Sequence, residues 1–230
     1  MNQLWPNTGQ QRALIWTIAF GVLLLALGVL ALTVRSNPDS SIEMSLMDWV
    51  RGWSAPGLDR LMADISRWTD YEGRLAVGIA AIVFLIVTGR TRRSWAVTLA
   101  VVIVALAAFG FDYGLGQFVE RGRPIAEPTG PSFPSGHTLG STVLFGFIAF
   151  LAIRHDVRLS VRVPLVASML ALILMVGTSR VFLSAHWPTD VAAGYLVGGI
   201  LLMLLVPLYG LCARAICDEE EMAVVEIGPG

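Results

Sequence analysis

The chain has 230 residues, of which 55% are hydrophobic and only 14% are charged, and its mean hydropathy is +0.69. Because soluble domains carry about 25% charged residues, the composition excludes an ordinary soluble domain and predicts a membrane protein. The formal net charge of −1 excludes the basic surface that is typical of nucleic-acid-binding proteins, so no nucleic-acid partner is expected. All 16 basic residues are arginine.

Six apolar segments predict six transmembrane helices, since a helix needs about 20 apolar residues to cross a bilayer. In chain order they cover residues 13–34, 72–89, 94–115, 136–153, 163–178 and 189–213. The first segment is longer than the roughly 7–15 apolar residues of a signal peptide, so we expect a retained anchor. The predicted fold class is an all-α membrane protein, with one six-span domain over residues 1–217.

Arginines in two short links orient these spans. Residues 90–93 contain three arginines and no acid, and residues 154–162 contain three arginines and one aspartate. Basic links remain in the cytoplasm, so both termini are predicted to be cytoplasmic and the first, third and fifth links face outward. Residues 218–230 are then an acidic cytoplasmic tail. A plasma membrane, the inner membrane of a bacterium, is the expected location.

The first outward link contains an amphipathic segment. Its apolar residues recur at helical spacing: Leu58, Leu61, Met62, Ile65 and Trp68. This pattern predicts a helix on the membrane surface, and Trp49 and Trp53 are expected at the level of the lipid headgroups. The apolar stripe fits packing against the bundle, and it also fits a lateral entrance for lipid.

Two residue types that often carry chemistry are assigned to ordinary roles outside the outward links. Cys212 and Cys217 lack the second pair of ligands that a zinc site requires. His155 lies in a basic cytoplasmic link, where a solvated surface role is expected.

Polar residues gather instead in the third and fifth links and at the adjoining helix ends. They are Arg121, Arg123, Ser135, Gly136, His137, Arg180, His186 and Asp190. Ionisable groups at membrane depth are costly and usually functional. Arginine forks fit phosphate oxygens, and the glycine-containing turn before residue 138 opens a helix whose free amides attract anions. The set therefore predicts a phosphate site that binds through Arg123, Arg180, Ser135 and Gly136.

Two histidines supply the predicted chemistry. His186 and Asp190 stand four residues apart, so the carboxylate is expected to hold one ring nitrogen and leave the other free to attack phosphorus. Pro188 is expected at the start of the last helix. His137, on another helix, is the expected general acid for the leaving oxygen.

These residues also allow three other interpretations. His137, His186 and Asp190 could form a metal site, but the neighbouring arginines would repel a cation, so no metal or cofactor is expected. Ser135 could be a nucleophile with a histidine base, although acyl transfer does not need several arginines. The polar groups could also merely pair across the bundle.

The spacing of these residues resembles the type-2 phosphatidic acid phosphatase superfamily of integral membrane lipid phosphatases. That family carries Lys-x6-Arg-Pro, then Pro-Ser-Gly-His, then Ser-Arg-x5-His-x3-Asp. Here the second motif is complete at residues 134–137, the third is complete from Ser179 to Asp190, and Arg123-Pro124 ends the first. The resemblance covers residues 111–201. It implies that His186 forms a phosphohistidine, that Asp190 orients it, that His137 is the acid, and that no metal is needed.

One position departs from the family pattern. Gly116 stands where the first motif has its lysine, seven residues before Arg123, and the link of residues 125–133 is short. The loss of a charge-assisted hydrogen bond costs about 1.5–3 kcal/mol. Arg121 is the expected replacement cation, and Gln117 is a weaker, neutral candidate.

The sequence therefore predicts a metal-independent enzyme that hydrolyses a lipid phosphate on the extracytoplasmic face. The resemblance implies polyprenyl pyrophosphate, phosphatidic acid or phosphatidylglycerol phosphate as substrate, with a slight preference for the polyprenyl compound. A lipid-linked phosphotransferase is an alternative. Because Gly116 breaks the first motif, a non-catalytic protein that binds lipid phosphate is another.

Overall fold

A computed structural model describes most of the chain. In the described residues all regular secondary structure is helical. The described residues are 9–38, 40–53, 55–70, 76, 79, 107–108, 110–125, 130–154 and 158–227, with side chains up to residue 212. The labelled helices are α1 (Gly9–Ser36), α2 (Ser41–Arg51), α3 (Leu58–Trp68), α6 (Gly136–Arg154), α7 (Leu159–Phe182) and α8 (Pro188–Ile227). Residues 110–119 are also helical.

Four described helices are long and apolar enough to cross a membrane: α1, α6, α7 and α8. They confirm four of the predicted spans and make this a multi-pass membrane protein. Almost all of the predicted span over residues 72–89, and most of the span over residues 94–115, lie outside the described residues, so the total of six remains a prediction.

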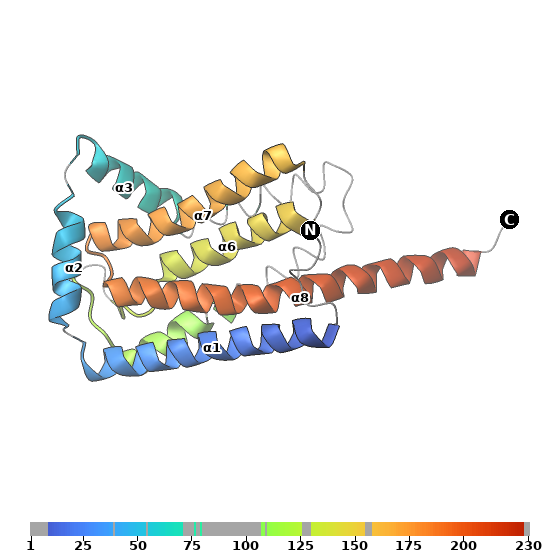
Figure 1. Ribbon diagram of the computed structural model, residues 1–230, viewed down its shortest axis with the longest axis horizontal. Helices are drawn as coiled ribbons and strands as arrows, with labels where there is room; N and C mark the ends of the chain where they lie inside the picture. Colours follow the sequence, from blue (N-terminus) through green and yellow to red (C-terminus); the bar gives the residue numbers. More distant parts are fainter. Residues whose placement is uncertain are drawn as a thin grey trace.

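Two helices extend beyond their predicted spans. Helix α7 continues past residue 178 to Phe182 because Ser179 and Arg180 are buried inside the protein and do not end the helix at a water-facing surface. The backbone of α8 remains helical to Ile227, through most of the predicted acidic tail. This end of α8 projects beyond the other helices (Figure 1).

The long helices lie side by side, with α6 packed against α7 and α8, and α1 packed against α8 (Figure 1). The main core lies between α6, α8 and α1 and includes Leu139, Val197 and Leu27. Many apolar side chains on α1 and α7 are exposed, such as Leu25 and Leu174. An apolar outer surface of this kind is expected of helices that face lipid.

Two glycines allow α8 to approach α6 closely. A Cβ atom at Gly194 would lie 2.8 Å from the Ser135 carbonyl oxygen, and one at Gly198 would lie 2.6 Å from the Thr142 Cβ. Small residues four positions apart commonly permit such contacts between membrane helices. The contact places the first turn of α6 beside the first turn of α8, so that the second and third motifs meet.

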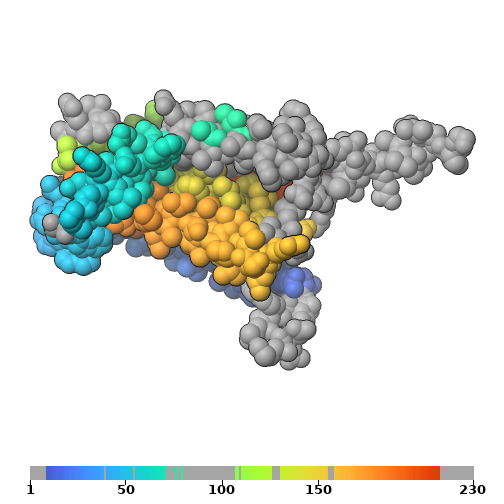
Figure 2. Space-filling model, turned by 90° about the horizontal axis from the view of Figure 1, so that it is seen from above, coloured from blue at the N-terminus to red at the C-terminus, as the bar shows by residue number. Residues whose placement is uncertain are grey.

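The link that follows α1 forms α2 and α3, which lie at one end of the bundle (Figure 2). Helix α2 contacts α7 and α8, and α3 contacts α7. The predicted helix over residues 58–68 is confirmed as α3, whereas α2 was not predicted. Leu58, Met62 and Ile65 pack against α7 and its neighbours, as expected for a helix docked on the bundle. Leu61 and Trp68 from the same stripe are exposed.

The two tryptophans of this link are also exposed. Trp49 and Trp53 pack edge to face, with ring centroids 5.0 Å apart. Their predicted position at the level of the lipid headgroups stays a prediction, as does a lateral lipid entrance beside α3.

Candidate active site

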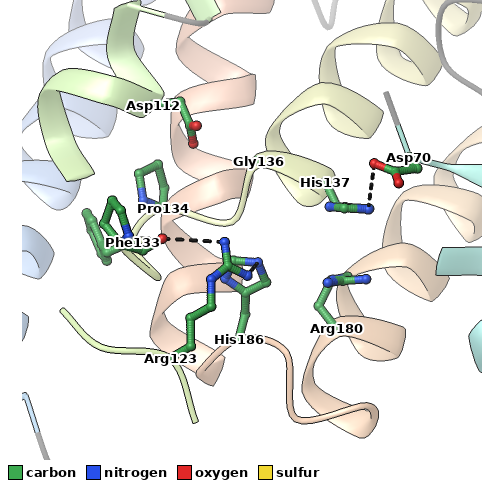
Figure 3. Close-up of a pocket in the computed structure, with 10 residues that line it drawn as sticks. Asp70, Asp112, Arg123, Phe133, Pro134, Gly136, His137, Arg180 and His186 are labelled. Atoms are coloured by element: carbon green, nitrogen blue, oxygen red, sulfur yellow. Dashed lines mark hydrogen bonds and ion pairs between the residues drawn. The ribbon is translucent and has the colours of Figure 1, made fainter. Parts of the chain in front are cut away.

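A cavity of about 280 Å³ lies at the end of the bundle that α2 and α3 cover. It brings together five of the predicted site residues: Arg123, Gly136, His137, Arg180 and His186. The remaining lining residues are Asp70, Asp112, Pro131, Phe133 and Pro134. Figure 3 shows Arg123 beside His186, with Arg180, His137 and Asp70 grouped on the other side of the cavity. Residues more than 100 positions apart in the chain therefore form one polar site.

His186 is almost completely buried, in the short link between α7 and α8. Its backbone N–H donates to the Arg180 carbonyl, and its Nδ1 lies 2.8 Å from the Ser132 carbonyl oxygen. A carbonyl oxygen only accepts hydrogen bonds, so this contact requires a proton on Nδ1. Nε2 of the neutral ring then carries the lone pair, and it lies 3.1 Å from Nη1 of Arg123.

Asp190 is fully buried in the first turn of α8, and its position differs in detail from the expected one. Its Oδ2 lies 3.8 Å from Nδ1 of His186, farther than the Ser132 carbonyl. The same oxygen accepts hydrogen bonds from the Ser132 hydroxyl and, at 2.9 Å, from the Trp187 backbone N–H. The carboxylate therefore contacts the residue that holds the ring, and it also caps α8. That helix begins at Pro188, as predicted.

His137 lies in the first turn of α6, where its ring reaches the cavity. Its Nε2 is 3.5 Å from Oδ1 of Asp70, the residue that follows α3 by two positions. A ring that reaches the cavity beside a carboxylate is placed to exchange a proton with a group bound there.

Two arginines reach the cavity from different elements. Arg180, in the last turn of α7, is largely buried and donates to the Ser66 hydroxyl of α3. Arg123 is half-buried, and its Nη1 lies 3.4 Å from the Ala185 carbonyl oxygen. Nε of Arg123 has no hydrogen-bond partner among the described residues. The two guanidinium groups bring donors suited to phosphate oxygens into a cavity that Asp70 and Asp112 also line.

Arg121 does not line the cavity, contrary to the expectation that it replaces the missing lysine. Its side chain is 1% exposed, and its five N–H groups make five hydrogen bonds. The acceptors are the Pro38 carbonyl oxygen (twice), the Thr189 hydroxyl, Asp190 and Glu43. A guanidinium whose donors are all used has none left for phosphate.

Ser135 and Gly136 mark the start of α6. The Ser135 carbonyl accepts from the Leu139 N–H, and its hydroxyl accepts from the Thr138 hydroxyl at 3.0 Å. Ser135 is fully buried and does not line the cavity, an arrangement that does not favour a serine nucleophile. Gly136 does line the cavity, beside Asp112: a Cβ atom there would lie 3.5 Å from Oδ1 of Asp112.

Three acidic residues in or around the site were not predicted. Asp112 lies inside a predicted span, and an acid at membrane depth is a signal that could have revealed it. Asp70 and Glu43 lie in the link that follows α1, whose mixed charge gave no such signal. Among the described residues, no group of three or more His, Cys, Asp or Glu side chains is placed to hold a metal ion.

Comparison with known proteins identifies a family for part of the chain. Residues 111–213 match the model of the PAP2 superfamily. These residues form a PAP2 superfamily domain. The resemblance predicted from the three motifs is thereby confirmed, and the matched PAP2 region contains every site residue predicted above.

Two relatives and one solved structure extend the comparison. The chain is 33% identical over 114 residues to phosphatidylglycerophosphatase B of Bacillus subtilis, a match that covers 45% of this chain and about half (55%) of that protein. It is 26% identical over 201 residues to an undecaprenyl-diphosphatase of Sulfolobus acidocaldarius, covering 81% and 88% of the two chains.

The solved structure is the crystal structure of a transmembrane PAP2-type phosphatidylglycerolphosphate phosphatase from Bacillus subtilis. It superimposes with a TM-score of 0.70 and 23% identity over 82% of this chain and 94% of that one. This likeness shows a shared fold that reaches beyond the PAP2 region.

Proposed function

We propose that this protein is a membrane lipid phosphatase that works through a phosphohistidine on His186. The observation that carries the proposal is the tautomer of that residue. The hydrogen bond from Nδ1 to the Ser132 carbonyl leaves the lone pair on Nε2, 3.1 Å from a guanidinium of the cavity. A nucleophilic nitrogen thus lies beside a group suited to binding phosphate oxygens.

In the proposed reaction, Nε2 of His186 attacks phosphorus and the bond from phosphorus to the lipid oxygen breaks. His137 gives its proton to that oxygen, and the Asp70 carboxylate lies 3.5 Å from Nε2 of this ring. Water then attacks the phosphohistidine, His137 accepts a proton from that water, and inorganic phosphate leaves. Throughout, Arg123 and Arg180 bind the phosphoryl oxygens, whose negative charge matches their forks.

The substrate class that we propose is a lipid phosphomonoester or pyrophosphate. The relatives are named for phosphatidylglycerol phosphate and undecaprenyl diphosphate, and both are lipids with a phosphate at the membrane surface. A cavity at one end of a bundle of apolar helices is suited to such a substrate, since its acyl or prenyl chain remains in the bilayer. From the arginine-rich links, we place the site on the extracytoplasmic face of the plasma membrane.

The test is an assay of purified protein in detergent with a panel of lipid phosphates: phosphatidic acid, phosphatidylglycerol phosphate and a polyprenyl pyrophosphate. We expect release of inorganic phosphate from at least one of them, in the presence of a metal chelator. Transfer of labelled phosphate to a lipid or sugar hydroxyl, without its release, would identify a phosphotransferase.

A second candidate function is binding of lipid phosphate without cleavage. It is favoured by Gly116 together with the burial of Arg121, because these leave Arg123 and Arg180 as the arginines that line the described cavity. Stoichiometric binding with no turnover on any member of the panel would support this function and contradict the phosphatase.

A further inference from the structure

A continuous set of buried polar contacts joins α2 to the predicted nucleophile. Glu43 of α2 contacts Arg121 at 2.5 Å, and Arg121 contacts Asp190 at 3.1 Å. Asp190 accepts a hydrogen bond from the Ser132 hydroxyl, and the Ser132 carbonyl accepts one from Nδ1 of His186. Of these five residues, only His186 lines the cavity.

Arg121 is the centre of this network. It lies between two carboxylates, and its guanidinium carbon is 4.8 Å from the centroid of the Trp187 ring. The backbone of Arg121 takes part as well, since its carbonyl accepts the Ser132 N–H at 2.8 Å. Buried charges are held only where they are paired and hydrogen-bonded, so these contacts define one geometry for the segment around residue 132.

Glu43 fixes the other side of the network. Its Oε2 contacts Arg121, and its Oε1 accepts the backbone N–H and the hydroxyl of Thr189 at 2.9 and 2.6 Å. Thr189 directly precedes Asp190 in the first turn of α8. A side chain of α2 therefore helps to fix both the guanidinium of Arg121 and the backbone beside Asp190.

We infer that Glu43, Arg121 and Ser132 are positioning residues that hold His186 in the orientation required for attack on phosphorus. The inference rests on the proposed function and extends it. Asp190 acts on His186 chiefly through Ser132, and the pair Glu43–Arg121 holds Asp190. Because misplacement of a reacting group by about 1 Å costs up to 100-fold in rate, loss of these contacts slows the chemical step.

This role differs measurably from phosphate binding and from simple stabilisation of the fold. Loss of a side chain that binds the substrate phosphate raises KM and weakens inhibition by inorganic phosphate. Substitution of a residue that only stabilises the fold lowers the melting temperature and leaves the turnover of the folded protein unchanged. Substitution of a positioning residue lowers kcat, and it leaves KM and inhibition by phosphate close to those of the wild type.

The test compares wild type with Arg121→Gln, Glu43→Gln and Ser132→Ala, and with Arg35→Gln as the matched control. Arg35 is an arginine of α1 that donates to the Phe118 carbonyl and packs on the Phe118 ring, outside the network. We expect kcat to fall about 10- to 100-fold in Arg121→Gln and at least several-fold in the other two. KM and the inhibition constant of orthophosphate should stay within about twofold. Arg35→Gln should retain wild-type kcat.

Wild-type kcat in the three variants would overturn the inference, and so would a rise in KM at unchanged kcat. Melting temperature and size-exclusion profile identify any variant that does not fold. Ser132→Ala removes one hydroxyl and no charge, so this variant decides the question if Arg121→Gln fails to fold.

A measurement without turnover separates this inference from the proposed function. The rate at which diethyl pyrocarbonate modifies His186, followed by mass spectrometry, reports how firmly the buried ring is held. We expect several-fold faster modification in Ser132→Ala than in wild type or Arg35→Gln, and equal rates would contradict positioning. A protein that cleaves no lipid phosphate but shows this difference refutes the phosphatase and retains the positioning.

Discussion

Gly116 and Pro131 pack so closely that a Cβ atom at position 116 would lie 2.9 Å from the Cγ of Pro131. The same Cβ would lie 3.4 Å from the Phe133 carbonyl oxygen. Gly116 occupies the position of the lysine in the first family motif, and Pro131 and Phe133 line the cavity. Pro131, in the link between the first two motifs, therefore packs where that lysine side chain would begin.

Restoring the lysine is expected to impair the protein. In Gly116→Lys and Gly116→Ala, the new Cβ must displace the rigid ring of Pro131, and overpacking of this kind costs about 1–3 kcal/mol. We expect a lower melting temperature and about tenfold lower kcat/KM for both. Gly114→Ala is the control, since a Cβ there meets nothing within 4 Å. Tighter phosphate binding by Gly116→Lys would show that the pocket accepts the family cation.

Arg123 is expected to contribute mainly to phosphate binding. Arg123→Ala removes a charged donor, and a charge-assisted hydrogen bond is worth about 1.5–3 kcal/mol. We expect about 10- to 150-fold lower kcat/KM and weaker inhibition by orthophosphate. Arg67→Ala serves as the control, because this exposed arginine pairs with Asp64 outside the cavity and exposed pairs contribute little. Unchanged phosphate inhibition in Arg123→Ala would remove Arg123 from the phosphate site.

His137 is expected to matter in proportion to the basicity of the leaving group. Loss of a general acid typically lowers the rate by about 100- to 10,000-fold, so His137→Ala should be severely slowed on a lipid phosphate. An aryl phosphate such as p-nitrophenyl phosphate has a leaving group that needs no proton, and its cleavage should fall far less. Equal losses on both substrates would contradict the assignment of His137 as the acid.

A larger side chain at the contact between α6 and α8 is expected to destabilise the protein. A Cβ at Gly198 would lie 2.6 Å from the Thr142 Cβ, whereas the nearest atom to a Cβ at Gly199 is a Leu23 Cδ1 at 3.8 Å. Gly198→Ala should therefore be destabilised by about 1–3 kcal/mol, and Gly199→Ala should not be. Thermal unfolding in detergent measures both. Similar melting temperatures for the two variants would show that α6 and α8 are not in such close contact.

Much of the fold followed from the sequence because apolar length and helical spacing are local signals. The spans at α1, α6, α7 and α8 were predicted in this way, as was α3 from its apolar stripe. Helix α2 was not predicted. Its contribution to the site depends on Glu43, whose partners Arg121 and Thr189 lie 78 and 146 residues away. Pairing over such separations leaves no local signal in the sequence.

The site residues were likewise predictable where the signal is local, and not where it depends on tertiary packing. Motif spacing identified Arg123, His137, Arg180 and His186, which do line one cavity. It assigned Arg123 to the first motif, but it could not show whether Arg121, the expected replacement cation, reaches the same phosphate or is separated from it. The separation comes from tertiary packing, which buries Arg121 between two carboxylates and leaves Arg123 at the cavity.

The most direct test of the central claim is to trap the phosphorylated protein. Wild type is mixed with a lipid phosphate labelled with ³²P, quenched within milliseconds in alkali, and examined for bound label that is stable in alkali and lost in acid, as expected of a phosphohistidine. We expect such label on the peptide that contains His186, and none in His186→Ala. Label that persists in His186→Ala, or turnover of that variant at the wild-type rate, would contradict the central claim.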